Sequence, residues 1–201
     1  MRIETPWGTW DHLPLEPVVA LFAGFPRPWW VAGGYAIDAF AGAGRREHED
    51  IDIGVFAADQ LAVQAHLAGW ELHAGDPPGT LRPWREGETL PPAVHDIWVR
   101  RDHGDSWRFQ LMLNPKGPGE FVCRRDERIR MPLGDAIWWR DGVPYLAPEV
   151  QLFFKAKAPR AKDEQDFVDC LPLLSAAQRG FLREALELSL PGHPWLGALS
   201  G

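Results

Sequence analysis

The sequence predicts an α+β fold in which a mixed sheet is flanked by helices and followed by a small helical subdomain. Three segments, 49–56, 94–101 and 107–113, alternate apolar and polar residues as half-buried strands do. Apolar residues at helical spacing lie between these segments and fill the chain after Pro144. We therefore expect a sheet domain over residues 1–146 and a C-terminal helical subdomain over residues 147–201.

The N-terminal part is expected to place two helices around one short buried strand. Residues 15–23 carry apolar side chains at helical spacing, and Gly24 is placed to end that helix. Residues 29–32 form an apolar run typical of a buried strand, which leads directly into a pair of glycines. The pattern is helical again over 35–42.

The rest of the chain is divided by its prolines, glycines and one capping motif. A helix is expected over 59–69, and a loop over the Pro- and Gly-rich stretch 75–92. Proline suits the first turn of a helix, which favours a helix over 148–157, with a second over 162–174. The sequence of 175–178 is a capping box that opens a third C-terminal helix.

Composition excludes several classes of protein. The 201 residues carry a formal net charge of −7, whereas a protein that grips a phosphate backbone usually has a basic face. No apolar run approaches the ~20 residues of a membrane span, and no signal peptide is recognisable. Cys123 and Cys170 are too few for a disulfide framework or a zinc site. We expect a cytoplasmic protein that binds neither nucleic acid nor membrane.

Two pairs of residues carry the chemical signal. Gly33 and Gly34 precede a helix N-terminus, where free N–H groups and the helix dipole favour an anion such as a triphosphate. Asp50 and Asp52 stand at alternate positions of a strand, so they point the same way about 7 Å apart. Carboxylates at that spacing can bracket two Mg²⁺ ions ~3.5–4 Å apart, as in two-metal phosphoryl transfer.

This combination resembles the nucleotidyltransferases with a polymerase-β-like fold, most closely their aminoglycoside and lincosamide branch. The resemblance implies that fold's mixed sheet flanked by helices, Mg²⁺ (two ions), and ATP or another nucleoside triphosphate as co-substrate. A looser similarity extends to the C-terminal helices, over Tyr145-Leu146-Ala147-Pro148-Glu149 and 155–166. The matching residues are Gly33-Gly34-Tyr35-Ala36-Ile37-Asp38, Gly42 or Gly44, Arg46, His48 and Asp50-Ile51-Asp52-Ile53.

By this resemblance, Asp50 and Asp52 are the expected metal ligands. The family also needs a third carboxylate on a neighbouring strand, either as a metal ligand or as the base that takes the acceptor proton. Asp96 fits best, because it lies in the alternating segment 94–101.

The resemblance also assigns residues to the nucleotide. Gly33 and Gly34 are expected to cradle the triphosphate, and Lys155 to reach its β- and γ-phosphates. Arg46 and His48 are expected to hold either the intervening loop or the phosphates.

Each assignment has a structural alternative. Arg46 and His48 can instead pair with neighbouring glutamates, and Lys155 can be a solvated helix lysine. The arginines between residues 124 and 130 could bind phosphate, but a solvated charged face is favoured, because acidic residues at 126 and 127 interrupt them. For Asp38, a structural role as a hydrogen-bonding partner is favoured over a role as a ligand.

Two other functions remain open. A metal phosphohydrolase of His-Asp type is suggested by His95-Asp96, but such sites lie on helices and this pair lies in a strand-like segment. The second is a catalytically inactive module of the same fold that binds a nucleotide or a partner. The resemblance favours an Mg²⁺-dependent enzyme that moves a nucleoside monophosphate, with AMP expected, from a triphosphate to a small-molecule hydroxyl. An aminoglycoside- or lincosamide-like acceptor is expected, and the oligomeric state is left open.

Overall fold

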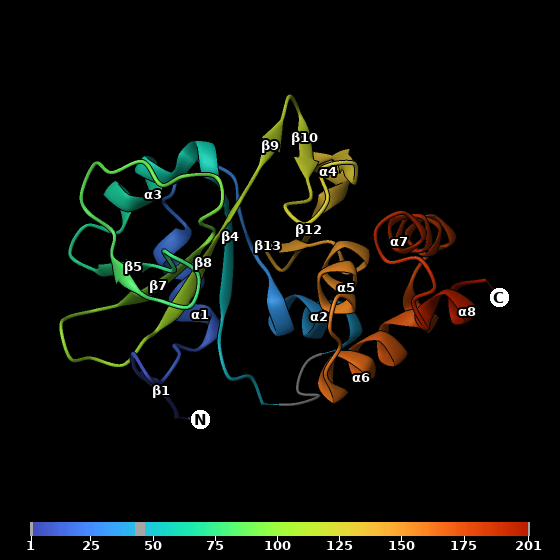
Figure 1. Ribbon diagram of the computed structural model, residues 1–201, viewed down its shortest axis with the longest axis horizontal. Coiled ribbons are helices and arrows are strands. Elements are labelled where there is room, and N and C mark those ends of the chain that lie inside the picture. The colour runs from blue at the N-terminus through green and yellow to red at the C-terminus, as the bar shows by residue number, and fades with distance from the viewer. Residues whose placement is uncertain (1, 43–46, 201) are drawn as a thin grey trace.

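The computed structural model describes residues 2–42 and 47–200, and its centre is an eight-stranded mixed sheet. The strand order is β12-β13-β3-β4-β8-β7-β5-β6, with β4 parallel to β8 and antiparallel to β3. Helices α5 to α8 gather at one side of this sheet, and the β9–β10 hairpin projects from it (Figure 1). The predicted α+β class with a mixed sheet is confirmed.

The strands are short, as the frequent prolines and glycines require. In chain order they are β1 Ile3–Thr5, β2 Gly8–Trp10, β3 Trp29–Val31, β4 Asp52–Phe56, β5 Glu71–Ala74, β6 Arg82–Pro83, β7 Asp96–Arg100, β8 Phe109–Asn114, β9 Lys116–Gly117, β10 Glu120–Val122, β11 Arg130–Pro132, β12 Ile137–Arg140 and β13 Val143–Leu146.

The six predicted helices are present with small shifts at their ends, and two short helices, over 133–136 and 195–199, were not predicted. In chain order they are α1 Leu15–Phe22, α2 Gly33–Ala41, α3 Gln60–His66 after the 3₁₀ turn η1 Ala57–Asp59, α4 Leu133–Ala136, α5 Pro148–Ala156, α6 Ala161–Cys170 with the turn η2 Leu171–Leu173, α7 Ala176–Ser189 and α8 Trp195–Leu199. The predicted capping box of α7 is confirmed, since Ser175 Oγ accepts the Gln178 N–H at 3.2 Å and Gln178 Oε1 accepts the Ser175 N–H at 3.0 Å.

The two faces of the central strands have different roles. Residues 51, 53 and 55 are buried against α1 and α3, together with alternate residues of β7 and β8. On the opposite face, Asp52 pairs with Gln110, and Asp96 pairs with Met112. Paired residues point to the same side of a sheet, so the acidic residues of β4 and β7 share one face.

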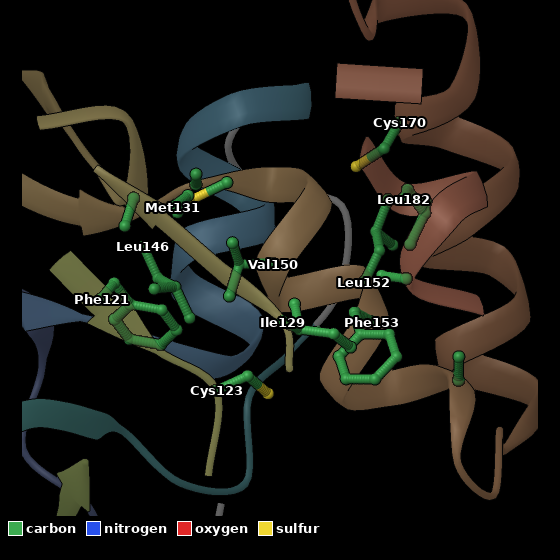
Figure 2. Packing of buried hydrophobic residues seen from close by; sticks show 14 of the residues in the cluster. Phe121, Cys123, Ile129, Met131, Leu146, Val150, Leu152, Phe153, Cys170 and Leu182 are labelled. Atoms are coloured by element: carbon green, nitrogen blue, oxygen red, sulfur yellow. The ribbon is translucent and has the colours of Figure 1, made fainter. Parts of the chain in front are cut away.

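The helices after Leu146 share a hydrophobic core with the sheet. Leu152 and Phe153 of α5 pack in one cluster with Leu182 of α7 and with Phe121 of β10. Figure 2 shows these side chains converging around α5. Trp30 of β3 belongs to the same cluster, so the helices form a packed continuation of the domain. A separate subdomain over residues 147–201 stays a prediction.

Strands β5 and β6 of the central sheet were not predicted, and β6 lies within the expected loop 75–92. Three further parts of the architecture were also not predicted. The N-terminal hairpin β1–β2, the small sheet β11-β10-β9 and the hairpin β12–β13 all come from segments with weak or short alternation. The last of these joins the central sheet, where β13 runs parallel to β3. In the residues that the structure describes, no helix has the length and apolar character to cross a membrane.

Candidate active site

A cavity of about 320 Å³ opens where β3 ends and α2 begins. Its walls come from both halves of the chain, because β3, β4 and α2 lie on one side and α5 and α6 on the other. We call it the Gly33 cavity. Its polar lining residues are Gly33, Gly34, Asp50, Asp52, Asn114, Arg124, Arg125, Gln151, Lys155, Lys157, Arg160, Lys162 and Asp163.

Gly33 is required by close packing at the first position of α2. Its φ is +66°, and a Cβ there would lie 2.2 Å from Asp52 Oδ2. Its N–H donates to Gln151 Oε1 of α5 at 2.8 Å. Helix α2 therefore begins at the glycine pair rather than at Tyr35, and one of its first N–H groups is already bonded.

Asp50 and Asp52 lie beside Gly33, but in different local structures. Strand β4 begins at Asp52, so the expectation that both carboxylates stand on one strand is wrong. The coil holding Asp50 continues the ladder only through the Ile51 carbonyl, which accepts the Gln110 N–H at 2.9 Å. Burial and then the charge of Asp50 raise the pKa of Asp52 to about 7. The charged form of this carboxyl is therefore disfavoured by its burial and by the neighbouring Asp50.

Asp96 lies on the same sheet face as Asp52, two strands away, with Gln110 between them. The Gln110 amide donates to Asp96 Oδ1 at 3.3 Å. Burial lowers the pKa of Arg124, and the charges of Asp96 and Asp52 oppose that shift, which puts this guanidinium near both carboxylates. Across residues 2–42 and 47–200, no three His, Cys, Asp or Glu side chains are gathered as a metal site.

A second cavity, of about 560 Å³, adjoins the first on the side of Asp96. We call it the Asp96 cavity. It shares three residues with the Gly33 cavity, and its full lining is His95, Asp96, Arg124, Arg125, Phe153, Lys157, Ser189 and Leu190.

Lys155 reaches the Gly33 cavity, but acidic partners hold its ammonium. Its Nζ lies 2.9 Å from Asp163 Oδ1 and 2.9 Å from Asp166 Oδ2, and its side chain is 8% exposed. Arg160 also binds Asp163, at 2.7 Å. This network fixes α5 against α6 and leaves part of the donor capacity of Lys155 facing the cavity.

His48 is buried away from the Gly33 cavity. Its Nε2 lies 2.7 Å from Asp38 Oδ2, and its ring packs on Tyr35 with centroids 4.3 Å apart. Of the two roles considered for His48, this geometry supports holding the loop before Asp50 and not contacting phosphate. Arg46 lies outside the described residues.

The sequence reasoning missed several lining residues. Arg124 was treated as part of a solvated charged face, yet it lines both cavities. Gln151 was not singled out, because a glutamine on an amphipathic helix carries no motif. The position of Arg124 follows from strand β10, which ends two residues before it and is too short for its sequence to predict. The cluster nevertheless splits, because Arg128 binds Asp126 instead, at 2.6 Å.

The fold is that of solved nucleotidyltransferases. The lincosamide antibiotic adenylyltransferase LnuA, solved with lincomycin bound, superposes with a TM-score of 0.55 and 15% identity, over 82% of this chain and 100% of that one. ANT(2")-Ia, solved in complex with adenylyl-2"-tobramycin, gives 0.53 and 14% identity, over 87% of this chain and 95% of that one.

One family profile matches part of the chain. The aminoglycoside-2''-adenylyltransferase family matches residues 14–74, which contain the glycine pair and both aspartates of the Gly33 cavity. No curated protein matches the chain by sequence. The predicted resemblance to the aminoglycoside and lincosamide branch is confirmed, and the prediction of a nucleotidyltransferase has the support of both comparisons.

The network around Lys155 predicts a loss of stability in acid. Burial raises the pKa of Asp163, but bonds from Arg160 and Lys155 outweigh it and bring the pKa below its ordinary value. A carboxylate with a lowered pKa stabilises the fold above its unfolded pKa of about 4 and loses that contribution as the pH falls. We expect Asp163→Asn to lower the free energy of unfolding by about 3 kcal/mol at pH 7.

Urea denaturation of both proteins between pH 7 and pH 3 tests this expectation. The difference between Asp163→Asn and the parent should shrink below about pH 4, because the unfolded parent takes up a proton there while the folded carboxylate stays charged. Glu187→Gln, which removes an exposed helix pair with N–O distance 3.9 Å, should change stability by less than about 0.5 kcal/mol. A difference that is equally large at pH 3 would contradict the assignment.

Proposed function

We propose that the protein transfers a nucleoside monophosphate, with AMP expected, from a nucleoside triphosphate to a hydroxyl group of a small molecule. The observation that carries the proposal is the Gly33 cavity, where a glycine-opened helix end meets two aspartates and several cations. A triphosphate needs this combination of backbone donors, positive charge and metal-binding carboxylates. The fold and the profile match over residues 14–74 support the same reaction class.

The donor set of the cavity suits Mg²⁺. Asp50 and Asp52 supply the carboxylate oxygens that this ion prefers. Burial and then the charge of Asp50 raise the pKa of Asp52, and a bound cation would favour its charged form. Gly33 has no Cβ, and this allows the Asp52 carboxylate to lie directly against the start of α2. Mg²⁺ bound by these two residues would neutralise charge on the triphosphate oxygens.

The residues of this chain then divide the remaining work. Gly34 and the start of α2 receive the phosphates, with Lys155 and Arg124 supplying positive charge near them. Asp96 accepts the proton of the acceptor hydroxyl, because it borders the neighbouring cavity and lies apart from Asp50 and Asp52. The acceptor oxygen attacks the α-phosphorus in line, the bond from that phosphorus to the bridging oxygen breaks, and pyrophosphate leaves.

Pyrophosphate release is the direct test. Each of the four nucleoside triphosphates is incubated with Mg²⁺ and the purified protein, with and without a panel of hydroxyl acceptors that includes amino sugars and lincosamides. We expect release that depends on both Mg²⁺ and one acceptor class, with a nucleotidylated acceptor visible by mass spectrometry. Inorganic phosphate released in place of pyrophosphate would indicate a phosphohydrolase and contradict the proposal.

A catalytically inactive module of the same fold is the second candidate, and one observation favours it. The three carboxylates are not gathered in the described residues, and Arg124 lies near both Asp52 and Asp96. Such a module would bind a nucleoside triphosphate with Mg²⁺ without releasing pyrophosphate for any acceptor. A phosphohydrolase of His-Asp type would need His95 and Asp96 on a helix. In this structure Asp96 begins strand β7, so the structure does not support that function.

A further inference from the structure

The acceptor of the proposed transfer would be bound in the Asp96 cavity. The Gly33 cavity contains the glycine pair and the two metal-binding aspartates, so it is the place for the triphosphate. The Asp96 cavity contains the proposed base and adjoins the first one along Arg124, Arg125 and Lys157. A hydroxyl at Asp96 would therefore face the α-phosphate from the second cavity.

The charge of the Asp96 cavity is positive. Three side chains of its wall, Arg124, Arg125 and Lys157, are cationic, and Asp96 is its one carboxylate. Arg124 is stabilised by Asp96 and Asp52. Arg125 donates to the Phe154 carbonyl and lies over the Phe154 ring. Within the described chain, neither Arg125 nor Lys157 is in an ion pair.

The other cations near the triphosphate site already have acidic partners. Asp163 binds Lys155 and Arg160, and Glu49 lies 2.7 Å from the Lys162 ammonium. Among the described residues, the positive charge without an ion-pair partner is thus concentrated on Arg125 and Lys157, which line the Asp96 cavity and its border with the Gly33 cavity. Like charges brought together on binding cost affinity, and opposite charges favour it.

We infer that the acceptor carries an anionic group, a carboxylate or a phosphate, in addition to the hydroxyl that is modified. The anionic group binds Arg125 and Lys157, and the hydroxyl lies against Asp96. A polycationic amino sugar would place its ammonium groups beside two unpaired cations. This inference rests on the proposed function for the place of the acceptor, and it adds the acceptor's charge.

The test compares one sugar ring in three charge states. Glucose, glucosamine and glucose 6-phosphate are titrated by NMR into protein saturated with Mg²⁺ and a non-hydrolysable ATP analogue. The bound analogue fills the triphosphate site, so that the sugar probes cannot bind there. We expect glucose 6-phosphate to bind at least about 5-fold more tightly than glucosamine, the size of effect expected for one charge near the surface.

Two variants separate the cavity from the general charge of the protein. Lys157→Gln should bring the dissociation constant of glucose 6-phosphate to within about 2-fold of that of glucose, while Arg183→Gln, on the exposed side of α7, should leave it unchanged. Equal or tighter binding of glucosamine, or an unchanged affinity in Lys157→Gln, would overturn the inference. The same holds if no probe binds once the ATP analogue is in place.

Because these readouts need no turnover, they separate the inference from the proposed function. Charge-selective binding without pyrophosphate release would refute nucleotidyl transfer and leave the anion preference standing. Pyrophosphate release that depends on a polycationic acceptor would support nucleotidyl transfer and refute the anion preference.

Discussion

Asp52→Asn should abolish nucleotidyl transfer while the protein stays folded. The substitution removes a carboxylate that is proposed to bind the metal, and losing one charge-stabilising group of this kind costs on the order of 10³-fold in rate. Pyrophosphate release under saturating triphosphate measures the loss. Thermal unfolding measures the fold, and we expect a melting temperature equal to or above that of the parent.

The expected thermal stability follows from the surroundings of Asp52. Burial and Asp50 raise its pKa to about 7, so the charged form is unfavourable in the absence of a cation, and a neutral amide of the same shape removes that cost. Asp105→Asn, at an exposed position in the turn between β7 and β8, is the matched control and should keep full activity. Full activity in Asp52→Asn would refute the metal assignment.

Gly33→Ala should nearly eliminate activity and also destabilise the protein. Its φ of +66° strains any side chain, and the new Cβ would lie 2.2 Å from Asp52 Oδ2. The left-handed conformation alone costs about 1–2 kcal/mol for alanine. The contact must in addition displace either the start of α2 or the Asp52 carboxylate, and both belong to the proposed triphosphate site.

Gly69→Ala is the matched control for Gly33→Ala. Its φ is +86°, and a Cβ there meets nothing within 4 Å. It should therefore show the backbone cost in urea denaturation and retain pyrophosphate release, whereas Gly33→Ala loses both stability and activity. Equal activity in the two variants would mean that the space beside Asp52 is not needed for the reaction.

Much of the fold could be predicted because its signals are local. Periodicity within single segments predicts six of the helices and the strands β3, β4, β7 and β8, and four adjacent residues predict the α7 capping box. Strands β9 to β13 were missed because they are two to four residues long and include prolines. Their pairing depends on contacts with distant segments, and a single-sequence pattern does not report these.

The part of the candidate site that lies in one short motif could be predicted, and the part that comes from distant segments could not. Gly33 and Asp52 belong to one short motif, and the structure brings them into contact distance. Arg124 and Gln151 come from other elements, and only the folded chain shows that they line the same cavity. The prediction that Asp50 lies in a strand was wrong. The alternation of apolar and polar residues includes positions 50 and 51, but strand β4 begins at Asp52.

The hydrogen bond from the Gly33 backbone to Gln151 ties the first glycine of the motif to a helix more than a hundred positions later in the chain. The proposed triphosphate site is thereby completed only after α5 has docked on the sheet. A growing polypeptide that has been synthesised only as far as β13 would lack this wall altogether. Assembly of the proposed site therefore coincides with packing of the hydrophobic cluster that α5 shares with β3 and β10, and a nascent chain would complete this site late.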